Sequence, residues 1–429
     1  MSALIIFGTF LVLCFLTVPI GIALGVAVVI YTMISGVGTV NMSYLATNMV
    51  TSCDSFPLLA IPFFVLAGAL MEGGGLSKRL VNFCDAFVGH KTGGLAIVTV
   101  LTCMFFGAIS GSSPATVAAI GTIMVPSMIE RGYDRKFSMA LVAASGCLGV
   151  IIPPSIPMVM FGVATGTSIS SLFMGGFLPG VVCGLCLIVL AVHISKKRGF
   201  HGNGLSFTWK RVGEEFKDAI WALLVPVIIL GGIYAGLFSP TEAAVVSVVY
   251  GLIVGLFIYK ELNLKKLLQK FGESSRTTGG IMIIVATGTI LGRVLTLEQI
   301  PQTVSQAITG MTDSRIVVLL IVNLMLLVVG CLMETTSAIL ILAPILTPIV
   351  AIYGVSPIQF GLIMVVNLAI GFITPPVGVN LFIACGIGNV KFQELIGAIV
   401  PFLLALLVAL ILITYIPAIS TFLPSLVAK

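Results

Sequence analysis

Long apolar runs constrain the fold of this chain more than any other feature of its sequence. Residues 219–238 and 395–419, for example, are mostly apolar, and each run exceeds the roughly 18 residues that a helix needs to cross about 30 Å of hydrocarbon. Only 8% of the residues are charged and 59% are hydrophobic, whereas a soluble domain averages about 25% charged residues. Because strand alternation is also absent, an outer-membrane barrel is disfavoured. We therefore predict an all-α polytopic membrane protein.

The N-terminal apolar segment is expected to remain in the protein as a membrane helix. Residues 1–13 lack the basic stretch that opens a signal peptide, and no small-residue cleavage site follows them. The net charge of +6 is explained by membrane topology, so we expect no nucleic-acid partner.

An internal duplication is visible when the chain is compared with itself at a shift of 222 residues. Rare residues then align in one collinear series without gaps. The aligned pairs are Pro126 with Pro348, Gly132 with Gly354, Gly149 with Gly371, Pro153-Pro154 with Pro375-Pro376, Gly166 with Gly388, and Pro179 with Pro401. The sequence thus predicts a first repeat at 1–200, a cytoplasmic amphipathic linker at 201–218 and a second repeat at 219–429.

Each repeat is predicted to contain the same series of elements. Two helices flank a proline break, and a short amphipathic stretch, one helix, a re-entrant hairpin, a Pro-Pro-broken helix and a final helix follow. In order, the predicted ranges are 2–17, 20–36, 39–53, 57–75, 93–129, 137–167 and 171–194 in the first repeat, and 219–238, 241–259, 263–275, 277–296, 316–352, 357–387 and 395–420 in the second.

The distribution of Lys and Arg predicts the orientation in the membrane. With this assignment, all Lys and Arg residues except Arg293, Arg315 and Lys429 fall on one side, which the positive-inside rule makes cytoplasmic. Both termini then face the periplasm, and the two hairpins enter from opposite sides as an inverted-topology repeat. Plain helix pairs in place of the hairpins would sort the loops in the same way, so charge determines the side and not the depth of each turn.

The first polar interruption, residues 107–116, lies in the middle of an apolar run. Gly, Ser and Pro break a helix there, and in hydrocarbon the freed backbone groups need partners, so such a break is expected to line a protein cavity. Its carbonyl and hydroxyl oxygens suit Na⁺, while helix N-termini that start at the break suit an anion. The alternative is a short turn outside the membrane between two helices.

The second interruption, residues 333–337, aligns with the first but carries Glu334. A carboxylate deep in a membrane protein is costly and is a functional candidate by default. Glu334 is expected to hydrogen-bond substrate hydroxyls or to help bind a cation, and a helix-capping role is compatible with both.

The two Pro-Pro pairs lie in register, each about 40 residues after a polar tip. Two successive prolines remove two backbone donors and free carbonyls one turn earlier, near Gly149, Ile152, Gly371 and Thr374. We therefore expect each broken helix to act together with the hairpin tip before it.

At these motifs the sequence resembles the large membrane subunit of tripartite ATP-independent periplasmic (TRAP) transporters, over essentially the whole chain and with a lean toward the sialic acid branch. The matching segments are Pro62-Phe63-Phe64, Ala67-Gly68, Phe106-Gly107-Ala108-Ile109-Ser110-Gly111-Ser112-Ser113, Arg131-Gly132-Tyr133, Ile152-Pro153-Pro154-Ser155 and Ile373-Thr374-Pro375-Pro376-Val377-Gly378. The resemblance implies an elevator-type fold, in which hairpins and broken helices move against a static scaffold. It also implies Na⁺-driven uptake of an organic acid, with two or more Na⁺ ions transported.

The resemblance further implies partners and sites. A soluble periplasmic binding protein would deliver the acid, and a separate small four-helix membrane subunit would complete the permease in the bacterial inner membrane. A first Na⁺ site is implied at Ser110, Ser112, Gly149, Ile152 and Pro154, and the repeat symmetry indicates a second at Glu334, Thr335, Gly371, Thr374 and Pro376. Substrate is expected between the two tips, near Ser112, Ser113, Ser155, Glu334 and Thr335.

Other functional classes are less consistent with the sequence. It contains no G-x-x-x-x-G-K-[ST] motif, so ATP hydrolysis through a P-loop is excluded, and without a catalytic constellation we do not expect an enzyme. A C4-dicarboxylate or other sugar-acid permease is the alternative within the family. A passive channel for small anions is the alternative outside it, although inverted repeats with hairpins favour alternating access.

Overall fold

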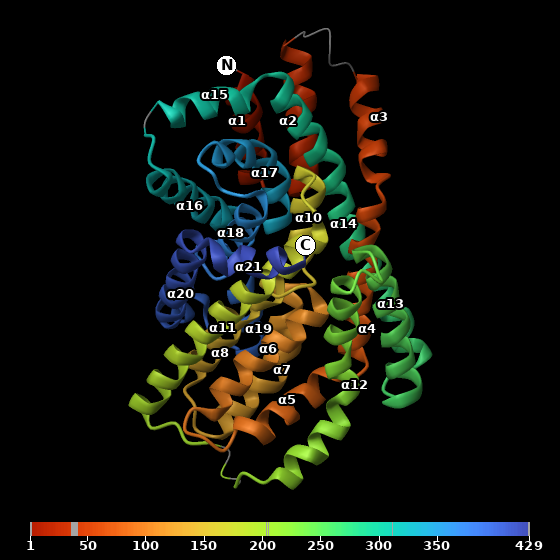
Figure 1. Cartoon of the computed structure of the whole chain (residues 1–429), viewed down its shortest axis with the longest axis vertical. Coiled ribbons are helices and arrows are strands. Elements are labelled where there is room, and N and C mark those ends of the chain that lie inside the picture. Colours follow the sequence, from red (N-terminus) through yellow and green to blue (C-terminus); the bar gives the residue numbers. More distant parts are fainter. Residues whose placement is uncertain (1, 36–41, 203, 205, 311, 428–429) are drawn as a thin grey trace.

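The computed structural model describes residues 2–35, 42–202, 204, 206–310 and 312–427. Within these ranges every regular element is a helix (Figure 1). Eight of the described helices are long and apolar enough to cross a membrane, and a bent pair of helices makes a ninth if it is counted as one span. The prediction of an all-α polytopic membrane protein is confirmed.

The first half of the chain forms twelve described elements. Their bounds are α1 (Ser2–Phe15), α2 (Ile20–Ser35), α3 (Met42–Cys53), η1 (Phe56–Leu59), α4 (Ala60–Gly73), α5 (Leu76–Val88), α6 (Gly94–Ser110), α7 (Ser113–Glu130), α8 (Arg135–Gly146), α9 (Leu148–Ile151), α10 (Ile156–Thr165) and α11 (Ile169–Arg198). Helix α5 is not among the predicted elements, because it is amphipathic and lacks a long apolar run. Residue 36 and residues 39–41, at the edges of two predicted segments, lie outside the described residues.

The second half of the chain contains eleven described elements. Their bounds are α12 (Trp209–Tyr234), α13 (Pro240–Ile253), η2 (Val254–Ile258), α14 (Leu264–Leu297), α15 (Ile300–Thr309), α16 (Arg315–Leu332), α17 (Thr335–Ile352), α18 (Pro357–Gly371), α19 (Val379–Gly388), α20 (Phe392–Tyr415) and α21 (Pro417–Val427). Helix α15, like α5, is a short amphipathic helix that the apolar pattern does not predict.

Three predicted boundaries in this half differ from the structure. Helix α12 begins at Trp209, so the second part of the predicted linker 201–218 is the first part of a spanning helix. Helix α14 is continuous across the boundary predicted at 276, because no proline interrupts it there. The predicted final helix 395–420 is two helices, since Pro417 disfavours helical backbone at Ile416, which has φ −114° and ψ 88°.

Both interrupted apolar runs form helical hairpins. In the first, α6 ends at Ser110, Gly111 adopts a left-handed conformation with φ 60°, and Ser112 caps α7 by accepting a hydrogen bond from the Ala115 amide. A residue with a side chain is strained at this φ, so glycine suits the turn. In the second, α16 ends at Leu332 and α17 begins at Thr335 after extended backbone at Met333 and Glu334.

Both Pro-Pro motifs interrupt a helix, as predicted. The first break runs from Ile152 to Ser155, and the two limbs on either side of it are bent by 41°. The second break is longer, from Phe372 to Gly378. Each break contains a cis peptide bond between its two prolines. The two halves are thus alike in plan but differ in the length of the broken segment.

The second limb of each broken helix packs against the hairpin of the other half. Helix α10 from the first half contacts α17 of the second hairpin, whereas α19 from the second half contacts α7 of the first hairpin. The first limbs contact the hairpin of their own half, since α8 contacts α7 and α18 contacts α16, and they also contact helices of the other half. This exchange brings the two tips and the two breaks into the same region.

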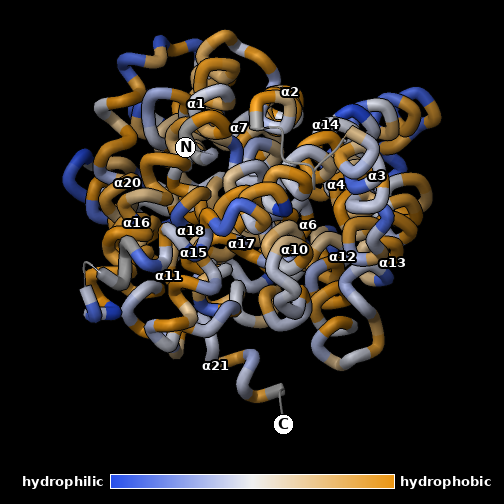
Figure 2. Tube along the Cα trace, turned by 90° about the horizontal axis from the view of Figure 1, so that it is seen from above, coloured by the Kyte–Doolittle hydropathy of each residue, from blue (hydrophilic) through white to orange (hydrophobic). Residues whose placement is uncertain are grey.

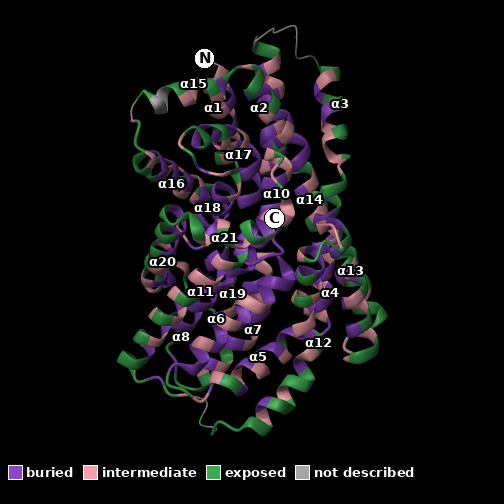
Figure 3. Ribbon diagram, viewed as in Figure 1, coloured by how far each residue is buried: buried purple, intermediate pink, exposed green. Residues whose placement is uncertain are grey.

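Burial and hydropathy are consistent with a membrane environment. Buried residues concentrate in the middle of the molecule, around α6, α7 and α19 (Figure 3). Hydrophobic residues also cover the outer helices (Figure 2); on α20, for example, Leu404, Val408 and Ile411 are each more than half exposed. Their spacing of four and three residues places them on one face of the helix, where lipid would cover them.

The two hairpins lie in opposite halves of the molecule. In Figure 1, α6 and α7 occupy the lower half together with the start of α12, whereas α16 and α17 occupy the upper half with the N-terminus. The last turn of α11, at the lower end, carries Lys196, Lys197 and Arg198. The positive-inside rule would make the lower end cytoplasmic, so entry of the first hairpin from the cytoplasm and of the second from the opposite side stays a prediction.

Candidate functional site

Oxygen atoms cluster at the tip of the first hairpin. The Ser110 hydroxyl lies 3.1 Å from the Thr116 hydroxyl and 3.4 Å from the Ser112 carbonyl oxygen. The Thr116 hydroxyl in turn donates to that carbonyl at 2.8 Å. Ser110 and Thr116 are buried and Ser112 is half-buried. The tip thus holds two hydroxyls and a main-chain carbonyl within reach of one small cation.

The first broken helix approaches this tip backbone to backbone. A Cβ atom added to Gly149 would contact the Thr116 hydroxyl and lie 2.6 Å from the Ser112 carbonyl oxygen. A Cβ atom added to Gly111 would lie 2.9 Å from the Pro154 carbonyl oxygen. Glycine at both positions therefore permits the close approach that brings the Pro154 carbonyl to the tip.

The structure brings together four of the five residues assigned to the first Na⁺ site, namely Ser110, Ser112, Gly149 and Pro154. The fifth, Ile152, is buried and is the C-cap residue of α9, where its amide donates to the Leu148 carbonyl at 2.9 Å. No described hydrogen bond joins Ile152 to the tip. Its assignment stays a prediction.

Two serines assigned to substrate lie behind the tip rather than on its open surface. The Ser113 hydroxyl is buried and lies 2.8 Å from the Asn380 side-chain nitrogen and 3.1 Å from its oxygen. The Ser155 hydroxyl is also buried and donates to the Val150 carbonyl at 2.6 Å. In this conformation both hydroxyls form hydrogen bonds within the protein, and neither Ser113 nor Ser155 lines the cavity described below.

The second tip has different chemistry. Glu334 is half-buried, and its carboxylate accepts a hydrogen bond from the Thr336 hydroxyl at 3.1 Å. The Thr335 and Ser337 hydroxyls are buried and have no partner among the described residues. Buried hydroxyls normally have partners, so this tip offers unused donors and acceptors beside a carboxylate.

The second break is more open than the first. Pro376 and Val377 are exposed, whereas every residue from Ile151 to Ser155 is buried. Gly371 packs against Gly330 of the hairpin, and the Thr374 hydroxyl donates back to Ile370 at 2.8 Å. No described contact joins Thr374 or Pro376 to Glu334 or Thr335, so the residues assigned to the second Na⁺ site lie less close together than those assigned to the first.

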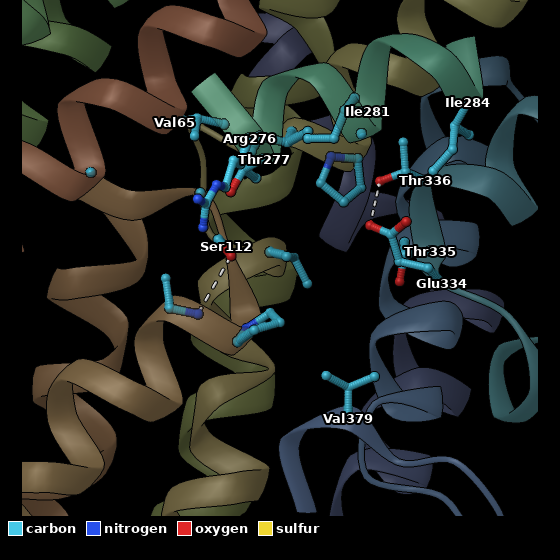
Figure 4. A pocket seen from close by; sticks show the side chains of 18 of the residues that line it. Val65, Ser112, Arg276, Thr277, Ile281, Ile284, Glu334, Thr335, Thr336 and Val379 are labelled. Carbon is cyan, nitrogen blue, oxygen red and sulfur yellow. Dashed lines mark hydrogen bonds between the residues drawn. The ribbon is translucent and has the colours of Figure 1, made fainter. Parts of the chain in front are cut away.

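Both tips line one cavity of about 810 Å³, together with Phe372 of the second break and with Val150 and Ile156, which flank the first break. Four helices begin at its wall: α7 near Pro114, α10 near Ile156, α17 near Thr335 and α19 near Val379. Across from them the wall is formed by α2, α4 and α14. Figure 4 shows Ser112 of the first tip and Glu334 of the second on opposite sides of this space.

The four helix N-termini give the cavity its electrostatic character. Each N-terminus is the positive end of a helix dipole, and at α7 and α10 the Ser112 and Ser155 side chains already accept hydrogen bonds from the Ala115 and Met158 amides. Together the four dipoles favour a negatively charged ligand. Glu334 is the N-cap residue of α17, and its negative charge opposes the positive helix dipoles at the second tip. The second tip is therefore more negative than the first, which carries no carboxylate.

Three residues of this region are not among the predicted site residues. Thr116 completes the oxygen cluster, and its position one helical turn after Ser112 is the sequence signal for it. Asn380 joins α19 to the first hairpin and also donates to the Ala143 carbonyl at 3.0 Å. Arg276 of α14 lines the cavity, but in the sequence it is one of many Lys and Arg residues on the cytoplasmic side.

Comparison with known proteins settles the family. Residues 7–419 match the family described as "Tripartite ATP-independent periplasmic transporter, DctM component". The chain belongs to the DctM family. It therefore represents the large permease component of a TRAP transporter, and the family that its motifs indicate is confirmed.

Several relatives of this DctM-family chain have named substrates. It is 47% identical over 418 residues to the isethionate TRAP transporter permease protein DctMQ of Oleidesulfovibrio alaskensis, covering 97% of this chain and 66% of that protein. It is 45% identical to the C4-dicarboxylate large permease protein DctM of Pseudomonas aeruginosa, covering 89% of each. It is 36% identical to the sialic acid large permease protein SiaM of Vibrio cholerae, covering 98% of each.

A solved structure shares the fold of this DctM-family chain. The YdaH transporter of Alcanivorax borkumensis, whose structure is described as having an unusual topology, superposes with a TM-score of 0.64. The match covers 87% of this chain and 88% of that one at 16% identity. At this identity the likeness concerns the fold alone.

Proposed function

We propose that this chain is the membrane permease of a Na⁺-coupled transporter that imports an organic acid by alternating access. One observation carries the proposal: four helix N-termini, two from each half of the chain, border a single cavity. The positive ends of their helix dipoles favour an anion. A volume of about 810 Å³ lies within the roughly 300–1,000 Å³ typical of small-molecule sites.

The first tip supports the Na⁺ part of the proposal. Ser110, Ser112, Thr116 and the carbonyl of Pro154 present oxygen atoms, which are the ligands that hard cations prefer. The described residues contain no cluster of three or more His, Cys, Asp or Glu that would instead favour a transition metal. We place a second Na⁺ beside Glu334 and Thr335, where Gly371, Thr374 and Pro376 would complete the site after the second break closes on the tip.

An elevator motion is consistent with the walls of the cavity. The moving part would contain both hairpins and both broken helices, and α2, α4 and α14 would form part of the scaffold. At Gly68 of α4, an added Cβ would lie 3.1 Å from the Ser110 Cα. Because Gly68 has no side chain, the backbone of the first tip packs closely against α4 and can move along it without a steric clash at this position.

The substrate is proposed as a small organic anion. Isethionate, C4-dicarboxylates and sialic acid, named for the three relatives, all carry a negative charge at neutral pH. The sialic acid branch, which the sequence favours, stays a prediction. The isethionate and C4-dicarboxylate relatives are 47% and 45% identical to this chain and the sialic acid relative 36%, so a substrate test needs all three.

The proposed partners follow from the names of the relatives. "Large permease protein" implies a smaller subunit, and the isethionate permease extends well beyond the region that this chain covers. We propose that the chain works in the bacterial inner membrane with a small four-helix subunit and a soluble periplasmic binding protein that delivers the acid.

Uptake into proteoliposomes tests this function. The permease, its small subunit and purified binding protein would be given radiolabelled isethionate, succinate and sialic acid under an inward Na⁺ gradient. We expect saturable uptake of one acid that needs both Na⁺ and its binding protein, and none when K⁺ replaces Na⁺. Non-saturable flux through the permease alone, without either requirement, would refute the proposal and support a passive anion channel.

A further inference from the structure

The charges around the cavity are unevenly distributed. Glu72, Glu273 and Glu334 bring three carboxylates to its lining, whereas Arg276 is the one Lys or Arg among the described residues that line it. Any anionic substrate in this space therefore faces more negative than positive side chains. The partners of these groups decide which charge is available to a ligand.

Two of the carboxylates are already paired. Lys270 lies 3.1 Å from a Glu72 oxygen and 3.0 Å from one Glu273 oxygen. The other Glu273 oxygen accepts a hydrogen bond from the Gln269 side chain at 2.8 Å. Glu273 is thus occupied on both oxygens, although it lies only three residues before Arg276 on the same helix, where an ion pair would otherwise form.

Arg276 itself is exposed and takes part in none of the ion pairs or side-chain hydrogen bonds found among the described residues. It lies on α14 about 18 Å from the helix start, at 1.5 Å per residue. Figure 4 shows its side chain pointing into the cavity, toward the first tip where Ser112 lies. The unpaired Arg276 guanidinium therefore faces the first hairpin tip, which, unlike the second tip with Glu334, carries no carboxylate.

Free space lies next to this side chain. Gly280 lines the cavity one helical turn after Arg276, and a Cβ atom added there would meet nothing within 4 Å. A ligand can therefore approach the guanidinium without displacing a side chain of α14. A guanidinium presents its donors as a rigid fork, which matches the two oxygens of a carboxylate or sulfonate.

We propose that Arg276 determines the specificity for an anion by pairing with the carboxylate or sulfonate of the substrate in the cavity. This inference rests on the proposed function, since it assumes an anionic substrate. It adds a charged partner on α14, a wall of the cavity opposite the hairpin tips, to the field of the four helix N-termini. The hydroxyls of the tips are then left to bind cations and the uncharged parts of the substrate.

Binding to the purified permease tests the proposal directly. Isethionate, succinate and sialic acid would be titrated at saturating Na⁺, with thermal stability as the readout, on Arg276→Gln, Arg276→Lys and the control Arg293→Gln. Arg293 is also an exposed arginine on α14, and it does not line the cavity. Losing a charge-assisted hydrogen bond should weaken anion binding about 10- to 150-fold in Arg276→Gln. Lys should restore part of the affinity, and the control should bind as wild type does.

Each outcome decides the proposal. Equal anion binding by Arg276→Gln and Arg293→Gln would overturn it while leaving the proposed function intact. Loss of the stabilisation by Na⁺ in Arg276→Gln and Arg276→Lys alike would also overturn it, because the residue would then hold the fold rather than the substrate. Binding of none of the three anions by wild type would instead count against both the anionic substrate and the role of Arg276.

Discussion

Replacing Thr116 by Val tests the first cation site most sharply. The two side chains have the same shape, so the change removes a hydroxyl and leaves the packing of the first tip nearly unchanged. The Thr116 hydroxyl is buried and lies 2.8 Å from the Ser112 carbonyl oxygen and 3.1 Å from the Ser110 hydroxyl. A cation held by these oxygens would lose one ligand.

The expected magnitude follows from the burial of this hydroxyl. Removing one partner from a buried polar site costs about 1–3 kcal/mol, which corresponds to about a 5- to 150-fold weaker affinity. The half-saturating Na⁺ concentration for uptake should rise by that factor. At 100 times the wild-type dissociation constant, Na⁺ stabilises a protein by about 2.7 kcal/mol, and a 100-fold weaker site would leave about 0.4 kcal/mol.

The assay compares initial uptake rates over a range of Na⁺ concentrations with the Na⁺-dependent rise in melting temperature. Thr99→Val is the matched control, because Thr99 is a buried threonine of the same hairpin whose hydroxyl donates to Leu95 at 2.8 Å, away from the tip. If Thr116→Val and Thr99→Val show the same half-saturating Na⁺ concentration as wild type, Thr116 is not a cation ligand. The oxygen cluster at the tip would then be purely structural.

Two further substitutions test how the broken helices meet the first tip. Gly149→Ala should abolish Na⁺-dependent uptake, because its Cβ would lie 2.6 Å from the Ser112 carbonyl oxygen. The control Gly292→Ala should leave uptake unchanged, because a Cβ there meets nothing within 4 Å. Equal uptake by the two variants would contradict the close packing of Gly149 against the first tip. Asn380→Ala should lower the free energy of unfolding by about 0.6–2 kcal/mol, since it removes the hydrogen bonds with Ser113 inside a membrane bundle; an unchanged melting temperature in detergent would show that these bonds add no stability.

Local features of the chain were sufficient to predict most elements. A helix that crosses lipid must be apolar along its whole length, so hydropathy alone marks spans such as α11 and α16. A proline or glycine inside such a run has few explanations, and the hairpin tips and breaks therefore stood out. Boundaries without these residues did not, which is why the continuous helix α14 and the start of α12 differ from their predicted ranges.

The first candidate site was predictable in part. Ser110, Ser112 and Gly149 lie in motifs that the repeat and the family resemblance both mark, and the structure places them together. Ser113 has the same residue type as Ser112 and is adjacent to it, yet it faces Asn380 instead of the cavity. Which of two neighbouring serines faces the open space depends on the turn at Gly111 and on packing from the other half of the chain.

The sequence by itself determined that this chain is a helical membrane protein made of two inverted halves with polar interruptions in register, because hydropathy, proline and glycine act over a few residues. Only the tertiary structure decided that α10 and α19 exchange partners between the halves and that four helix N-termini meet at one cavity. It also decided that Arg276 faces this cavity. Contacts between segments hundreds of residues apart depend on how whole helices pack, and no local pattern records that arrangement.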